Sequence, residues 1–231
     1  MKILRTLLIP VMMVMAGLNQ EVKSAIIPTL FNSGVDSAGN TVTTGSVDAH
    51  YTLISVPPGS GFSTSAYVAD TTPPIVSAWV NPGSTARWIG PVTDVATMSA
   101  ATTTGDYVYQ TTFDLTGFDE TSAVLTGQWS VDDISSTLSI NNVATGFTIT
   151  GASAYASLHN FSISSGFVAG LNTLQFTVSN VTIVGGLNPS GLVVLISGTA
   201  NPVAVPEPGS MALFGVGAAG LALAYRRRKT A

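Results

Sequence analysis

The chain has 231 residues and no cysteine, which excludes disulfides, thiol nucleophiles and thiolate metal sites. Between Ala25 and Val205 there is one basic residue, Arg87, against ten acidic residues, so this region carries a formal charge of −9. A surface this acidic offers no basic stripe that could release counterions from phosphates, and nucleic acid is therefore excluded as a partner.

The first 24 residues have the three parts of a secretory signal peptide. Lys2 and Arg5 precede an apolar run from Leu7 to Leu18, and a polar stretch then leads to Ser24. We expect cleavage after Ser24, following export through the Sec translocation machinery. The alternative is an N-terminal membrane anchor, for which the apolar run is short.

The region 25–203 is predicted to be a single all-β domain. Apolar and polar residues alternate in short segments separated by turn residues, as in strands with one buried face. Strands are predicted at 50–56, 107–115, 123–131, 137–140, 160–163, 174–178 and 192–196. Asn141 and Asn142 tolerate positive φ and predict a tight hairpin after 137–140. The pattern favours an antiparallel β-sandwich, of jelly-roll type.

Part of this body resembles the galactose-binding-like jelly rolls, which include sugar-binding domains attached to glycosidases. The resemblance rests on a strand that contains Trp129 and is followed by Asp132, and on a strand that ends at Asn141. It continues in the stretch from Gly170 to Leu174, which leads into a strand that ends at Asn180. It implies the fold more directly than a ligand, because this fold hosts many functions.

Aromatic side chains in the loop-rich N-terminal part are candidates for stacking on a sugar ring. Trp79 and Trp88 are the candidate ligand-binding residues, and Tyr51 and Tyr67 lie in the same part of the chain. Sugar stacking requires their aromatic faces to be exposed; packing in the core or a loop is the favoured alternative for each. Trp129, in contrast, is expected in the core because it follows the apolar phase of its strand.

A calcium ion is the one metal that the sequence suggests, with Asp132 and Asp133 as ligands; the alternative for this pair is a solvated turn. A serine hydrolase is disfavoured, because only His50 and His159 could act as the base and no nucleophile elbow is present. Carboxylates that neighbour each other in a strand, such as those of 119–120, point to opposite faces. The sequence therefore predicts a protein that is not an enzyme.

The segment 204–231 differs from the body in composition and charge. Its first part is Val205, Pro206, Glu207, Pro208, Gly209 and Ser210; an apolar stretch rich in Gly and Ala follows at 211–225, and the basic tail is Arg226, Arg227, Arg228 and Lys229. A helix over 211–225 is about 22 Å long, against the roughly 30 Å of a bilayer's hydrocarbon core. We predict a short transmembrane helix whose basic end stays in the cytoplasm.

This tripartite tail resembles the PEP-CTERM sorting signal of Gram-negative bacteria. The resemblance implies recognition by a membrane-embedded exosortase and a link to exopolysaccharide production. We therefore expect an exported protein that is anchored transiently in the inner membrane and then reaches the cell surface or extracellular matrix. Its sandwich is expected to bind extracellular polysaccharide. The alternatives are a purely structural envelope protein without a sugar site, a tail that is never cut and, least favoured, a secreted hydrolase.

Overall fold

The computed structural model describes residues 23–69, 78–98, 103–151, 153–181, 186–203 and 210–229. Most of the predicted signal peptide and the motif residues 204–209 lie outside the described residues. The elements are β1 (Ala25–Ile26), β2 (Val47–Ser55), β3 (Ser65–Val68), β4 (Ile89–Gly90), η2 (Val95–Thr97), β5 (Gly105–Asp114), β6 (Phe118–Asp132), β7 (Ser135–Ile140), β8 (Val143–Thr150), η3 (Ala154–Ala156), β9 (His159–Ile163), β10 (Leu171–Asn180), β11 (Gly191–Pro202) and α2 (Ser210–Lys229).

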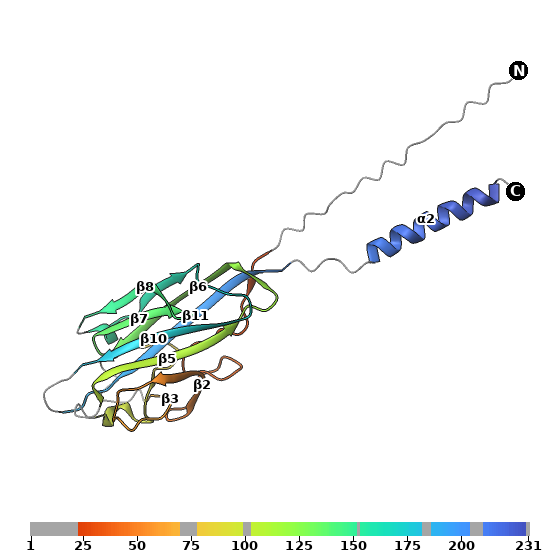
Figure 1. Cartoon of the computed structure of the whole chain (residues 1–231). Helices are drawn as coiled ribbons and strands as arrows, with labels where there is room; N and C mark the ends of the chain where they lie inside the picture. The colour runs from red at the N-terminus through yellow and green to blue at the C-terminus, as the bar shows by residue number, and fades with distance from the viewer. Residues whose placement is uncertain are drawn as a thin grey trace, which may run out of the picture.

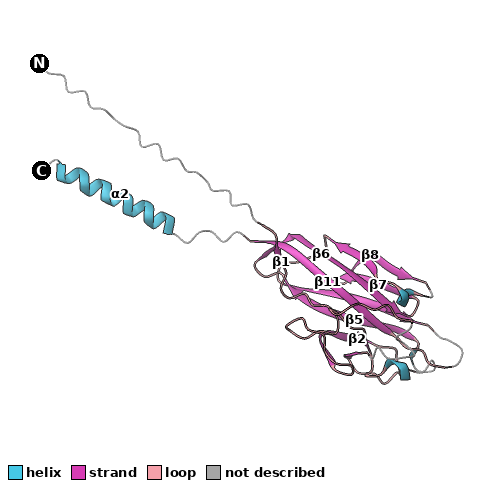
Figure 2. Cartoon of the chain, turned by 180° about the vertical axis from the view of Figure 1, so that it is seen from behind, coloured by secondary structure: helices cyan, strands magenta, loops and turns pink. Residues whose placement is uncertain are grey.

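The strands of the described residues form one continuous antiparallel sheet that folds into two layers (Figures 1 and 2). Their order is β8-β7-β10-β5-β2-β3-β4-β11-β6-β9, with β1 added beside β11. The short strands β3 and β4 join the layers, so that β5 and β10 face β6 and β11. Trp129 of β6 meets Phe176 of β10 between the layers, with ring centroids 5.4 Å apart.

The chain winds between the two layers as in a jelly roll. It changes layer at the connections β5–β6, β6–β7, β8–β9, β9–β10 and β10–β11. Only the β7–β8 hairpin stays within one layer over this part of the chain. The predicted fold class, an all-β antiparallel sandwich with jelly-roll winding, is confirmed.

The alternation of apolar and polar residues along the strands produces the hydrophobic core. In β10, Leu174, Phe176 and Val178 are buried, while the residues between them lie on the outer face. Trp129 is buried at 1% exposure, so its predicted place in the core is confirmed. The predicted hairpin is confirmed as well, because Asn141 and Asn142 have φ of 49° and 64°.

Each predicted strand is present, and the sequence analysis missed β1, β3, β4 and β8. The alternation of apolar and polar residues does not reveal β8, because this strand pairs only with β7 and most of its side chains are exposed. Gly146, at φ 84°, also interrupts its alternation. Strand β6 begins at Phe118, before the predicted strand 123–131.

The two ends of the body lie at the same end of the sandwich. Ala25 of β1 pairs with Ala200 of β11, and we call this end the terminal pole. Gly191 of β11 pairs with Asp132 of β6 at the other end, the distal pole. A strand rises about 3.3 Å per residue, so the poles are roughly 30 Å apart along β11.

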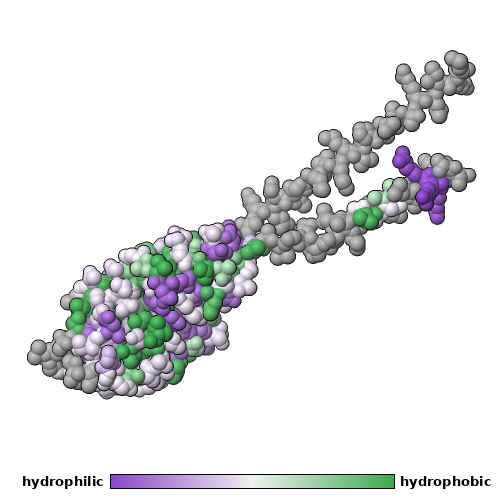
Figure 3. All heavy atoms as spheres, viewed as in Figure 1, coloured by the Kyte–Doolittle hydropathy of each residue, from purple (hydrophilic) through white to green (hydrophobic). Residues whose placement is uncertain are grey.

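The C-terminal helix α2 includes the predicted helix 211–225 and the basic tail. Arg226, Arg227 and Arg228 are exposed, and they make the end of α2 strongly hydrophilic (Figure 3). Among the described residues, no helix has both the length and the apolar character that a membrane span requires.

Candidate functional site

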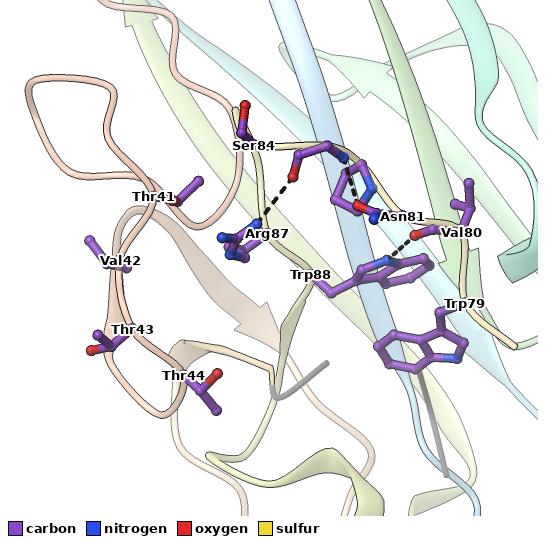
Figure 4. A pocket seen from close by; sticks show the side chains of 12 residues that line it. Thr41, Val42, Thr43, Thr44, Trp79, Val80, Asn81, Ser84, Arg87 and Trp88 are labelled. Carbon is purple, nitrogen blue, oxygen red and sulfur yellow. Dashed lines mark hydrogen bonds between the residues drawn. The ribbon is translucent and has the colours of Figure 1, made fainter. Parts of the chain in front are cut away.

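The two tryptophans predicted as ligand-binding residues lie against each other in the loop before β4. The rings of Trp79 and Trp88 have centroids 4.2 Å apart and are tilted by 35° (Figure 4). Trp88 Nε1 donates to the carbonyl oxygen of Val80 at 2.9 Å, and Val80 N donates to Tyr155 O at 2.7 Å. The loop is therefore fixed at both tryptophans.

A tight turn places Arg87 beside this tryptophan pair. Gly83, at φ 82°, donates its N–H to Asn81 Oδ1 at 2.9 Å, and its carbonyl oxygen accepts from Arg87 Nη1 at 3.1 Å. The Arg87 backbone N–H donates to Ser33 O at 2.9 Å. Arg87 makes no ion pair with the described residues, and it is the one basic residue of the region 25–203.

These residues line a cavity of about 860 Å³, which we call the first cavity. The loop 41–44 forms the opposite wall and brings three threonines to it (Figure 4). The full lining is Thr41, Val42, Thr43, Thr44, Trp79, Val80, Asn81, Pro82, Gly83, Ser84, Arg87 and Trp88. The cavity thus combines indole rings with hydroxyl, amide and guanidinium groups.

An exposed platform of Trp79, Trp88 and Tyr51 is not observed. Trp79 is 8% exposed, Trp88 1% and Tyr51 0%. The rings contribute edges to the cavity wall while most of their surface is in the core. Tyr67 is more accessible, and its hydroxyl lies 3.5 Å from Ser63 Oγ. A role for Trp79 and Trp88 in ligand binding stays a prediction.

Asp132 forms a hydrogen bond with one member of this tryptophan pair, Trp79. It ends β6 at the distal pole, is 7% exposed, and its Oδ2 accepts a 2.7 Å hydrogen bond from Trp79 Nε1. Burial raises the pKa of Asp132 to about 7, although the Trp79 hydrogen bond acts in the opposite direction. Sequence reasoning could not find this contact, because it joins residues that are 53 positions apart.

Asp133 faces a different neighbour. Its Oδ2 accepts from Val181 N at 3.1 Å, and burial raises the pKa of its carboxyl group. Within the described ranges, no three His, Cys, Asp or Glu side chains gather in a way that could hold a metal ion. Calcium binding by Asp132 and Asp133 therefore stays a prediction based on two carboxylates.

The two histidines lie apart from these groups. The ring of His50 stacks on Phe31 with centroids 3.7 Å apart, and His159 Nε2 lies 3.4 Å from Ser157 Oγ. The carboxylate of Asp119 accepts from its own turn, at Thr121. These contacts fix local structure.

Comparison with known proteins identifies the tail. Residues 204–229 match the family model of the PEP-CTERM protein-sorting motif, so the chain carries this motif as predicted. Fold and tail together define an all-β sandwich protein that ends in a protein-sorting motif. A search of curated proteins gives no match.

Two solved structures are similar to the body at low scores. CBM35 from Paenibacillus barcinonensis is 8% identical and covers 64% of this chain and 92% of its own, with a TM-score of 0.34. The CBM36-1 domain of a multidomain xylanase from the hindgut metagenome of Trinervitermes trinervoides is 15% identical, with a TM-score of 0.26. The match covers 43% of this chain and 75% of that domain. Scores this low carry no argument about function.

Proposed function

We propose that this protein is a non-catalytic cell-surface or matrix protein, exported by Sec and sorted by an exosortase. The match of residues 204–229 to the PEP-CTERM protein-sorting motif carries the proposal. The N-terminal segment 1–24 supports it, because its sequence has the parts of a signal peptide.

The tail acts in two steps. First, the apolar stretch 211–225, which is shorter than a full membrane span, holds the exported body at the inner membrane. The basic residues 226–229 stay in the cytoplasm because moving cations across a bilayer is costly. Second, the exosortase cuts near the Pro-Glu-Pro stretch. Pro206 and Pro208 disfavour a helix there, so the chain can enter a protease as an extended segment.

The pairing of β1 with β11 gives the anchored protein an orientation. Both membrane-directed segments join the body at the terminal pole, where Ala25 pairs with Ala200. Trp79 and Asp132 lie at the distal pole, roughly 30 Å away along β11. The anchored body therefore presents its distal pole away from the membrane.

Pulse-labelled cells test the sorting proposal. The wild-type chain is expected first in the membrane fraction and later at the surface or in the medium. A chain without 205–231 is expected to be exported but never to enter the membrane fraction. The same distribution for both chains would contradict the proposal.

A second candidate function, binding of extracellular polysaccharide, is favoured by the composition of the first cavity. Indole edges of Trp79 and Trp88 offer apolar contact for sugar C–H groups, and Asn81, Arg87 and the threonines offer hydrogen bonds to hydroxyl groups. The volume of about 860 Å³ lies within the range of ligand pockets.

Substitutions in the polar lining of the first cavity test polysaccharide binding better than substitutions of the tryptophans do. Replacing either buried tryptophan by Ala costs about 3–5 kcal/mol of stability and so confuses binding with folding. Arg87→Gln removes the charge; losing one charged hydrogen bond weakens binding about tenfold or more. Thr148→Ala, on exposed β8, is the matched control. If the wild-type protein binds no envelope polysaccharide, the purely structural alternative stands.

A further inference from the structure

A second cavity lies behind Trp79, at the distal pole. It has a volume of about 230 Å³ and is lined by Ala78, Trp79, Ala96, Asp132, Tyr155, Leu187 and Pro189. Most of these side chains are apolar, and Leu187 is 51% exposed at its rim. Since a water occupies about 30 Å³, the cavity has room for one six-membered ring with a single substituent.

Asp132 supplies the one carboxyl group in the described lining of this cavity. Trp79 Nε1 binds Asp132 Oδ2 and so fixes the carboxyl group. The other oxygen, Oδ1, accepts no hydrogen bond from the described residues. Asp132 is one of the residues that line this cavity. The side chain is otherwise buried, at 7% exposure.

Charge favours a cation as the occupant. Arg87, the one basic residue of the region 25–203, lines the first cavity and not this one. The second cavity therefore combines an acidic acceptor, apolar walls and an aromatic edge, with no described basic residue in its lining. Ca²⁺ prefers six to eight oxygen ligands, and the described lining of this cavity, which does not include Asp133, supplies one carboxyl group.

We propose that the second cavity binds a small organic cation: a protonated amine on a single ring. The ammonium group donates to Asp132 Oδ1, and the carbon ring packs on Trp79 and Leu187. Cations are attracted to indole, and a charged hydrogen bond inside an apolar pocket is stronger than one in water. The amine can be a free small molecule or an amino sugar within a polysaccharide.

A pair of probes of equal size tests the charge requirement. Cyclohexylamine and cyclohexanol differ in charge and fill the same volume. Isotope-labelled protein is titrated with each, and the indole N–H signals are followed, since the chain has three tryptophans. We expect cyclohexylamine to shift the Trp79 signal with at least tenfold higher affinity than cyclohexanol. Equal affinities would overturn the proposal.

Asp132→Asn tests the carboxylate directly. The Asn side chain keeps an acceptor for Trp79 Nε1 and loses the charge, so cyclohexylamine affinity is expected to fall about tenfold or more. Glu120→Gln, at the opposite end of β6, is the control and is expected to leave the affinity unchanged. Undiminished binding to the Asp132→Asn variant would overturn the proposal.

Glucosamine and glucose, each titrated into the wild-type protein at pH 7, distinguish the two sources of the amine. Preference for glucosamine indicates an amino sugar, and binding of cyclohexylamine alone indicates a less polar amine.

The amine proposal does not rest on polysaccharide binding in the first cavity. The cyclohexylamine assays contain no polysaccharide, so they can fail even if Arg87→Gln weakens polysaccharide binding. Equally, cyclohexylamine can bind even if the protein binds no polysaccharide.

Discussion

Replacing Asp132 by Asn should change how the stability of the protein depends on pH. The pKa of Asp132 is raised from 3.8 to about 7 because the carboxyl group is buried. The folded protein therefore holds a proton that the unfolded chain releases, so stability falls as the pH rises from 3.8 towards 7. One pKa unit corresponds to about 1.4 kcal/mol, and the full effect is on the order of 4 kcal/mol.

The comparison of pH 5 with pH 8 isolates this group. Over that interval the wild-type protein is expected to lose roughly 3 kcal/mol relative to the Asp132→Asn variant. For a domain of this size that is a difference of roughly 6–12 °C in Tm. Burial also raises the pKa of Asp48 and Asp133, but both groups are present in the wild-type protein and in the variant, so the difference between the two proteins reports Asp132.

Urea unfolding, followed by tryptophan fluorescence at both pH values, measures the two free energies of unfolding. Glu120→Gln is the control and should keep the wild-type slope, because it leaves the Asp132–Trp79 contact intact. Equal pH slopes for the wild-type protein and the Asp132→Asn variant would refute the reasoning, since Asp132 would then not titrate in this interval.

The remaining predictions concern the sandwich. Gly127→Ala places a methyl group against Leu195 O and the ring of Phe161, so thermal unfolding should show a loss of about 1–3 kcal/mol; an unchanged Tm would contradict this packing. Asn141→Ala loses hydrogen bonds to Gly166 O and Thr173 N and keeps a strained positive φ, so it should cost about 2 kcal/mol in urea unfolding. By contrast, Asn142→Gly relieves a φ of 64° and should change stability by less than about 1 kcal/mol; equal losses at the two positions would argue against this hairpin.

Local sequence predicts the parts of this protein that depend on local chemistry. The alternation through Leu174, Phe176 and Val178 reveals a buried strand face, because side chains alternate along a strand. The Asn141–Asn142 pair reveals its turn, since both residues tolerate positive φ. The sorting tail is recognised for the same reason: its motif, apolar stretch and basic end are contiguous.

Contacts between distant segments were beyond the sequence. Alternation shows that a residue points inward, but not which residue it meets across the layers. The Trp79–Asp132 hydrogen bond, the Trp79–Trp88 contact and the burial of both rings depend on how the loop before β4 returns to the sheet. For this reason the sequence offered the tryptophans and the acidic pair as separate candidates, whereas the structure joins Asp132 to the tryptophan pair.

The intact mass of the mature protein, purified from the cell surface or the medium of cells that express the full chain, is the most direct test of the sorting proposal. The proposal predicts a species that begins at Ala25 and lacks helix α2 together with the basic tail. A released protein that retains Ala231 would contradict it.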